Sequence, residues 1–201
     1  MIVCHDPKFC YFAPQKTGTS SMGQVLMQLS LVRNMRFKHA LHLSQLKRSG
    51  YQEHPRPDYF HFITVRDPFT RAVSLWHHIL RRTGCRTAAG RAAHQLACRS
   101  SFAEFMTTIG KKALFAVDPP GFTHPQCRWL NAMPRVHARV HLENFEEDVR
   151  KQPFVPDDMI TGHVNKNAPV GDHYAGSVGE AARNVVRDWY SEDFEKLGYA
   201  K

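Results

Sequence analysis

Two short apolar runs in this chain each pass through a polar turn directly into a helical pattern. The first run covers residues 9–13 and the second covers residues 59–65. Both are rich in aromatic residues, which is typical of buried strands. After each turn, apolar residues recur at spacings of three and four, which predicts an amphipathic helix. This repeated order of strand, turn and helix predicts an α/β fold with a mainly parallel central sheet flanked by helices.

The rest of the chain is interpreted from the same patterns. We expect further elements at these positions: a strand at 137–142 and helices at 102–109, 143–150 and 177–197. Residues 82–100 are basic and rich in small residues, which indicates a mobile loop or a weak, exposed helix. Residues 152–175 contain proline and glycine without periodicity, and long loops of this kind often close over a ligand. A chain of this length predicts a single domain, 1–201.

The chain carries a formal net charge of +9, without counting its 13 histidines. A surface this basic favours anionic partners, such as nucleic acid, acidic polysaccharide, phosphate-bearing molecules or anionic membranes. No apolar stretch approaches the ~18 residues that a membrane-spanning helix needs, so no membrane span is expected. The first residues lack a basic region followed by an apolar one, so no signal peptide is expected and the predicted location is cytoplasmic.

The five cysteines lie at positions 4, 10, 85, 98 and 127 and form no C-x-x-C pair, which argues against a zinc or redox motif. Free thiols in a reducing compartment are the simplest interpretation. Cys85 and Cys98 bracket the basic segment, and their spacing permits a disulfide in an oxidising compartment without indicating one.

The first strand-to-helix turn has the sequence PQKTGTSS at residues 14–21. Backbone N–H groups at the start of a helix lack intrahelical partners and the helix dipole adds positive charge, so an anion is favoured there. Gly18 allows the backbone to approach a phosphate, and Lys16 adds a full charge. The turn also supplies the hydroxyls of Thr17, Thr19, Ser20 and Ser21. A simple helix cap needs fewer of these groups, so the turn predicts an anion site.

The second turn begins at the end of the run 59–65 and reads VRDPFTRAVSLW. Asp67 is a favourable helix N-cap, and Pro68 suits the first helical position. Arg66 follows the strand directly, and its planar guanidinium is suited to phosphate oxygens. Together with Ser74 on the following helix, Arg66 indicates a second anion site. The alternative is a plain helix cap in which Arg66 pairs with an acid.

These two turns resemble the donor-binding motifs of sulfotransferases that use 3′-phosphoadenosine-5′-phosphosulfate (PAPS). PQKTGTSS resembles their 5′-phosphosulfate loop, P-K-T-G-T-[TS]-S, from which Gln15 departs. FITVRDPFTRAVSLWHH resembles their 3′-phosphate segment, F-x-x-V-R-[DN]-P-x-x-R-x-x-S. The similarity to the carbohydrate branch, sulfotransferase family 2, and to its short microbial members continues along nearly the whole chain. It comprises KHA at 38–40, FAEF at 102–105, PQCRWL at 125–130, LENFEED at 142–148, HVNKN at 163–167 and DWYSEDFEKLGY at 188–199.

The resemblance implies a P-loop-like, three-layer α/β fold that binds PAPS, transfers its sulfuryl group to a hydroxyl of an acceptor and releases the product PAP. The acceptor is expected to be a carbohydrate, and no metal is expected. By position, the residues implied to hold the 5′-phosphosulfate are Lys16, Thr17, Gly18, Thr19, Ser20 and Ser21. Arg66 and Ser74 are implied to hold the 3′-phosphate. Asn165 and Lys166 lie in a loop that is implied to close over the nucleotide.

Sulfuryl transfer needs a cation at the leaving phosphate and a base at the acceptor hydroxyl, by analogy with phosphoryl transfer. Lys16 is the expected cation. A histidine suits the role of base at neutral pH, and the resemblance implies His39, in RFKHALH, as the catalytic base. The alternatives that remain open are His42, His77, His78, a carboxylate or no base.

Two other classes of function remain open. A P-loop kinase of a nucleotide or small molecule is disfavoured, because the lysine of the first turn precedes its glycine, unlike the order in a Walker A motif. A non-enzymatic polyanion binder fits the net charge, but the chain shows no recognised nucleic-acid motif, and no specific nucleic acid is expected. The basic segment 81–99 either binds an anionic acceptor, such as an acidic or already sulfated glycan, or is a solvated loop.

Overall fold

The computed structural model describes six stretches of the chain, and the structural statements below concern these residues: 1–33, 37–39, 56–81, 88–111, 124–159 and 179–200. The chain divides into two compact units, each assembled from two separate stretches of sequence. The first unit comprises Met1–Arg66 and Arg128–Lys166, and the second comprises Asp67–Cys127 and Asn167–Lys201. The first strand-to-helix turn therefore belongs to the first unit.

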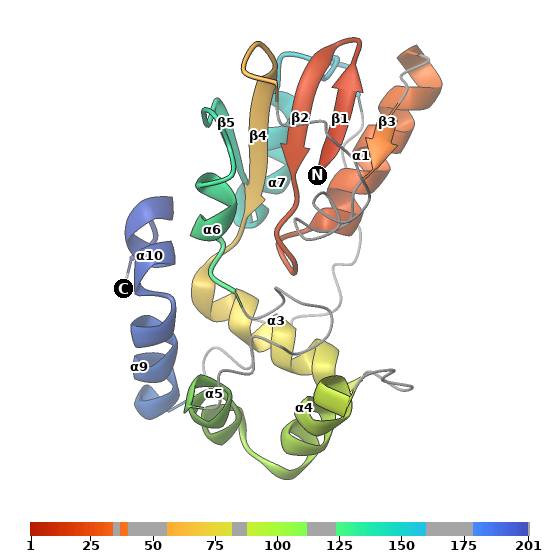
Figure 1. The fold of residues 1–201 in the computed structure, drawn as a ribbon. Helices are drawn as coiled ribbons and strands as arrows, with labels where there is room; N and C mark the ends of the chain where they lie inside the picture. The colour runs from red at the N-terminus through yellow and green to blue at the C-terminus, as the bar shows by residue number, and fades with distance from the viewer. Residues whose placement is uncertain (34–36, 40–55, 82–87, 112–123, 160–178, 201) are drawn as a thin grey trace. The chain divides into compact units, whose positions relative to one another are not determined.

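The first unit is built on one sheet of five strands in the order β3-β1-β2-β4-β5 (Figure 1). Their bounds are β1 Ile2–His5, β2 Lys8–Phe12, β3 Phe37–His39, β4 Phe60–Val65 and β5 Ala138–His141. β1 is antiparallel to both β2 and β3, whereas β2 and β5 are each parallel to β4. All strands except β1 therefore run in one direction, which confirms the α/β class with a mainly parallel sheet.

Three of the five strands correspond to predicted ones, because β2, β4 and β5 lie within a residue or so of the runs 9–13, 59–65 and 137–142. The other two, β1 and β3, were not predicted. β1 has four residues and β3 has three, and such short segments show too little of an apolar period to be recognised.

Both faces of the sheet are buried, as is usual for strands with parallel neighbours. On one face, Phe9 and Phe62 pack in a cluster with helices α1 (Thr19–Arg33) and α7 (Phe145–Arg150). On the other face, Ile63 is also completely buried. α1 and α7 confirm the helices predicted after the first turn and at 143–150.

The register of the strands determines which residues share the carboxyl edge of the sheet. His39 at the end of β3 lies level with Tyr11 of β2, because the backbones of both residues pair with Ile2 of the intervening β1. The first turn follows β2, and Arg66 follows the parallel neighbour β4. Ligands of open α/β sheets bind at this edge.

The second unit consists of helices around an apolar core of its own. Their bounds are α3 Pro68–Leu80, α4 Ala88–Arg99, α5 Phe102–Lys111, α9 Glu180–Trp189 and α10 Ser191–Leu197. A short helix α6, Cys127–Leu130, spans the boundary between the units. At the start of α3, the Asp67 carboxylate accepts a hydrogen bond from Thr70 N (2.8 Å) and Pro68 takes the first helical position, which confirms the predicted cap.

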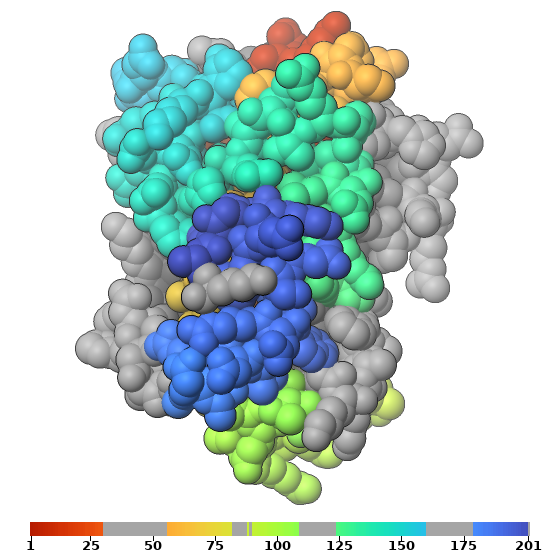
Figure 2. Space-filling model, turned by 90° about the vertical axis from the view of Figure 1, so that its left-hand side faces the viewer, coloured from red at the N-terminus to blue at the C-terminus, as the bar shows by residue number. Residues whose placement is uncertain are grey.

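The structure refines two of the predicted segments. Residues 88–99 form α4, so this part of the segment 82–100 is a helix rather than a loop. Many residues of this helix are exposed, as predicted, but Ala93 and Ala97 are buried in the core. The predicted helix at 177–197 is broken at Tyr190 (φ −111°, ψ 26°) into α9 and α10, the adjoining lighter and darker blue areas of Figure 2. No described helix is both long and apolar enough to cross a membrane.

Candidate functional site

The turn after β2 has an unusual backbone. Lys16 has a φ of 66° and Gly18 a φ of 87°, both in the left-handed region that side chains disfavour. A Cβ atom at Gly18 would collide with Leu142 Cδ1, which belongs to the 3₁₀ turn η2 (Leu142–Asn144) after β5. The space beside this glycine is thus filled by the protein itself. Glycine is favoured here by its φ, and a larger residue would also have to displace the end of the Leu142 side chain; both reasons come in addition to any approach to a phosphate.

Helix α1 begins at this turn and presents its positive end there. Met22 N donates to Gly18 O at 3.0 Å, so the N–H groups of the preceding three residues lie in the first turn of the helix. The first turn contains no acidic side chain that would offset the helix dipole. Together with the charge of Lys16, this arrangement is suited to an anion such as a phosphate.

A chain of buried hydroxyls anchors the turn to the sheet. Thr17 Oγ1 donates to Pro14 O at 2.7 Å, and Thr64 Oγ1 lies 2.9 Å from both Thr17 Oγ1 and the Tyr11 hydroxyl. Each hydroxyl has one proton, so Thr64 donates to Thr17, and Tyr11 donates to Thr64. Tyr11, Thr17 and Thr64 are all completely buried. This chain fixes the start of the turn against β2 and β4.

Burial raises the pKa of Tyr11, although the neighbouring hydroxyls of Thr64 and Thr19 act in the opposite direction. The phenol therefore remains protonated at physiological pH and keeps its role as a donor. Because the carbonyl at the far end of the chain only accepts, the direction of all three hydrogen bonds is fixed.

The hydroxyls of the turn differ in how accessible they are to a ligand. Those of Thr17 and Thr19 both donate to Pro14 O, at 2.7 and 3.2 Å, and Ser21 is almost completely buried. Ser20 is exposed, and Lys16 is half-buried. A ligand at this turn would therefore meet backbone N–H groups, the Ser20 hydroxyl and the Lys16 ammonium, rather than the Thr17 hydroxyl.

The other predicted site residues are distributed between the units. Arg66 is half-buried in the first unit, and Ser74 is half-buried on α3 in the second. The backbone of His39 lies at the carboxyl edge of the sheet, and its segment is a strand rather than a helix. The remaining predicted residues His42, Asn165 and Lys166 lie outside the described residues.

His77 and His78, the other two candidate bases, lie half-buried near the end of α3. Burial lowers the pKa of His77, and the positive charge of Arg81 lowers it further. His77 is therefore neutral at pH 7, as a general base must be.

A histidine that the sequence did not single out lies at the same sheet edge as the first turn. The backbone N–H of His141, at the end of β5, donates to Asp148 Oδ2 on α7, and His141 Nδ1 lies 2.9 Å from the same oxygen. Burial acts to raise the pKa of Asp148, but these hydrogen bonds and the nearby Lys151 hold it below its ordinary value. The carboxylate therefore fixes the orientation of this imidazole.

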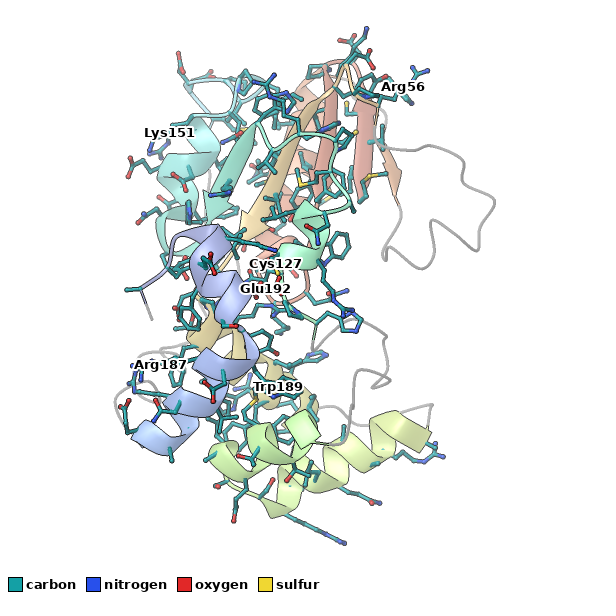
Figure 3. The ribbon with its side chains drawn as sticks, turned by 60° about the vertical axis from the view of Figure 1, so that its left-hand side comes forward. Arg56, Cys127, Lys151, Arg187, Trp189 and Glu192 are labelled. Carbon is teal, nitrogen blue, oxygen red and sulfur yellow. The ribbon has the colours of Figure 1, made fainter. Side chains whose placement is uncertain are left out.

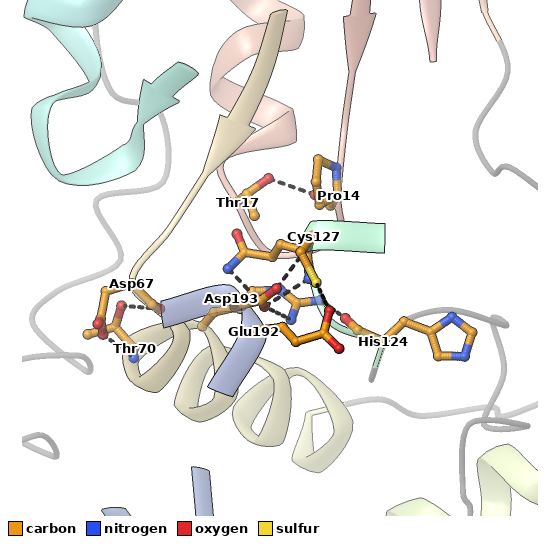
Figure 4. A network of polar contacts seen from close by, with 10 residues as sticks. Pro14, Thr17, Asp67, Thr70, His124, Cys127, Glu192 and Asp193 are labelled. Carbon is orange, nitrogen blue, oxygen red and sulfur yellow. Dashed lines mark hydrogen bonds and ion pairs between the residues drawn. The ribbon is translucent and has the colours of Figure 1, made fainter. Parts of the chain in front are cut away.

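Arg71, which shares the second motif with Arg66 and Ser74, has a structural role. Its guanidinium is buried, donates to His124 O at 2.9 Å and lies 4.0 Å from Asp193 on α10. The Asp193 carboxylate also accepts hydrogen bonds from Gln126 N (2.8 Å) and, as Figure 4 shows, from Cys127 N (2.7 Å). This network joins α3, α10 and the segment before α6 within the second unit.

Removing the central hydroxyl of the buried chain tests the anchoring of the turn. Thr64→Val keeps the shape of the side chain but leaves the hydroxyls of Tyr11 and Thr17 without one partner each. We expect unfolding to become easier by about 1–3 kcal/mol, the usual cost of an unsatisfied buried polar group. Urea denaturation measures this loss. Thr64→Ser keeps the hydroxyl and should retain more of the stability, and equal losses in both variants would show that the hydroxyl is not what matters.

Sequence reasoning missed Tyr11, Thr64 and Leu142, although all three help to shape the turn. Tyr11 and Thr64 are polar residues near the carboxyl ends of strands that are mostly apolar, a signal that is available in the sequence. That they contact each other follows only from the pairing of β2 with β4. Among the residues that the structure describes, no three His, Cys, Asp or Glu side chains are grouped as in a metal site.

Comparison with known proteins agrees with the arrangement of motifs and fold. The family model described as the sulfotransferase family matches residues 1–151, which include both strand-to-helix turns and all five strands. Searches of curated proteins and of solved structures found no match. The matched region covers most of the chain, and this chain therefore belongs to the sulfotransferase family.

Proposed function

We propose that this protein is a PAPS-dependent sulfotransferase that transfers a sulfuryl group to a hydroxyl of an acceptor, and that the acceptor is a carbohydrate. Family membership establishes the sulfotransfer reaction in general. The observation that supports PAPS as the donor is the turn at 14–18. In this turn, Lys16 and Gly18 both have a left-handed backbone, and α1 begins there at the carboxyl edge of a mainly parallel sheet.

The described residues fit the 5′ end of such a donor. The start of α1 offers backbone N–H groups without an acidic side chain in its first turn. Lys16 and the exposed Ser20 add a charge and a hydroxyl donor. Because the buried hydroxyl chain holds the turn in place, these donors are positioned before a ligand arrives, which reduces the entropy lost on binding.

For the 3′-phosphate, we propose Arg66 and Ser74 as ligands. Arg66 follows β4 at the same sheet edge as the first turn, and a guanidinium binds phosphate oxygens in a bidentate manner. Ser74 lies on α3 after the capped start of that helix. Asn165 and Lys166 are proposed to close over the nucleotide.

In the proposed reaction, the acceptor hydroxyl attacks the sulfur in line with the leaving phosphate oxygen. Lys16 stabilises the negative charge that develops on that oxygen, an effect that acts mainly in the transition state. A histidine removes the proton of the acceptor hydroxyl, and we propose His39 for this role because its backbone lies level with β2 at the carboxyl edge. This scheme does not require a metal ion.

Thermal melting with different nucleotides tests the proposal. PAP at 100 times its dissociation constant should stabilise the folded state by ~2.7 kcal/mol, which raises the melting temperature measurably. ATP with Mg²⁺ at the same concentration should have a smaller effect, because it lacks a 3′-phosphate. A larger shift with ATP and Mg²⁺ than with PAP would contradict the proposal and favour a kinase. Stabilisation by heparin but by neither nucleotide would favour a polyanion-binding protein.

A further inference from the structure

Two side chains one helical turn apart on α4 bring a thiol and an imidazole together. Cys98 Sγ lies 3.6 Å from His94 Nε2, and both residues belong to the second unit. Cys98 is exposed to solvent, and His94 is half-buried. Because Ala93 and Ala97 are buried in the core, the helix that carries this pair is held firmly against its neighbours.

The second ring nitrogen of His94 determines which way the proton lies between the pair. His94 Nδ1 is 2.9 Å from Ile79 O at the end of α3. A carbonyl oxygen only accepts hydrogen bonds, so Nδ1 must carry a proton and donate it. In the neutral imidazole, Nε2 is then the acceptor, and the Cys98 thiol donates to it. A nucleophile next to a base that a third group orients is the general arrangement of an activated nucleophile.

The other described cysteines lack this arrangement. Cys127 is buried, its thiol donates to Glu192 Oε2 at 3.5 Å, and the two residues lie together in Figure 3. Burial, with the negative charges of Asp193 and Glu192, raises the pKa of Cys127 to about 12. Cys4 is buried as well and donates to a backbone carbonyl, and burial raises its pKa. Cys10 is completely buried. Of the described thiols, only Cys98 combines exposure with a neighbouring base.

We propose that Cys98, assisted by His94, is a site of S-thiolation by low-molecular-weight disulfides. His94 Nε2 takes the thiol proton, and the Cys98 sulfur attacks one sulfur of the disulfide. The new bond joins Cys98 Sγ to that sulfur, the original S–S bond breaks, and the released thiolate takes the proton back from His94. The balance is one protein thiol and one disulfide converted into one mixed disulfide and one small thiol.

The position of Cys98 makes the contribution of His94 measurable. Cys98 lies in the last turn of α4, and the following residue, Arg99, is exposed and positively charged. Exposure, the Arg99 charge and the His94 base are therefore three separable causes of reactivity.

The test measures the rate of mixed-disulfide formation at Cys98 with bis(2-hydroxyethyl) disulfide, a neutral reagent, at pH 7 with EDTA, by mass spectrometry of the tryptic peptide. The parent and all variants in this test carry Cys85→Ser, because a free Cys85 thiol in the basic segment would be able to attack the mixed disulfide at Cys98 and remove the adduct. His94→Asn keeps a donor for Ile79 O but removes the base from Cys98. It should slow the reaction at least about tenfold, since general bases contribute that much or more.

Arg99→Ala is the matched control and should change the rate less than about threefold, as is usual for one exposed charge. Equal rates for His94→Asn and the parent would overturn the proposal, because exposure alone would then explain the reactivity. The proposal would also be overturned if Arg99→Ala slowed mixed-disulfide formation as much as His94→Asn does. Cys127 reports on folding, since it stays unreactive in an intact second unit. If it reacts in His94→Asn, the same comparison is made with His94→Gln.

Discussion

Lys16→Ala is expected to weaken PAP binding by about 10- to 100-fold, because it removes the cation that we propose to bind the 5′-phosphate at the first turn. A hydrogen bond from a charged donor contributes about 1.5–3 kcal/mol, and about 1.4 kcal/mol corresponds to a factor of ten in Kd. The same variant should lower kcat for sulfuryl transfer further, since Lys16 is also proposed to stabilise the transition state. Isothermal titration calorimetry with PAP measures the first effect without knowledge of the acceptor.

Lys8→Ala is the matched control, because it removes the same charge from the same unit. Lys8 is exposed at the start of β2, while the turn follows the end of that strand, and its ammonium lies 3.9 Å from the Asp58 carboxylate. We expect this variant to change the Kd of PAP less than about twofold, as for exposed ion pairs in general. Equal losses in the two variants would show that net charge, rather than Lys16 at the turn, controls binding.

Asp193→Asn is expected to lower the free energy of unfolding by about 3–5 kcal/mol, the largest stability effect that the structure predicts. The substitution removes the carboxylate charge that lies 4.0 Å from the buried Arg71 guanidinium, and breaking one partner of a buried ion pair has this magnitude. It also weakens the hydrogen bonds that the carboxylate accepts from Gln126 N and Cys127 N. Urea denaturation followed by tryptophan fluorescence measures the change.

Glu192→Gln tests whether the effect depends on burial. Glu192 is the exposed neighbour of Asp193 on α10 and contacts Cys127 Sγ and Lys196. Removing its charge should change stability by less than about 1 kcal/mol, because exposed ion pairs contribute little. Similar losses of stability in Asp193→Asn and Glu192→Gln would show that burial of the Arg71–Asp193 pair does not determine its contribution.

The features that the sequence predicted well are those encoded by neighbouring residues. The runs that form β2 and β4 are rich in aromatic residues and are followed by turn residues, and Asp67 and Pro68 indicate the cap of α3. The turn between β2 and α1 was located correctly for the same reason. Each of these features depends on contacts within a few positions of the chain, so its pattern is complete in one stretch of sequence.

The features that escaped prediction depend on contacts between distant residues. Thr17 meets Thr64 across 47 positions, and Tyr11 meets Thr64 across 53. The break between α9 and α10 places Asp193 against the backbone of residues 126–127, which no helical period reveals. Its only local signal is the acidic first turn of α10, Glu192 and Asp193, which is typical of a helix start.

A glycine at position 18 has two explanations, the approach of a phosphate and the packing of the turn itself, and the sequence alone does not distinguish them. A glycine in an anion-binding turn is expected to let the backbone approach a phosphate. The structure adds that Leu142 fills the space where a Cβ would lie, and that the φ of 87° disfavours any side chain. The contact with Leu142 links the turn to β5, which lies more than a hundred residues further along the chain.

The most direct test of PAPS as the donor is the affinity of the purified chain for PAP compared with 5′-AMP, measured by calorimetry under the same conditions. The two nucleotides differ only by the 3′-phosphate, for which Arg66 and Ser74 are the proposed ligands. We expect PAP to bind about 10- to 100-fold more tightly, as is usual for charge-assisted hydrogen bonds to one phosphate, and Arg66→Ala to remove most of this difference. Equal affinities of the wild-type chain for the two nucleotides would contradict a site for the 3′-phosphate and with it PAPS as the donor.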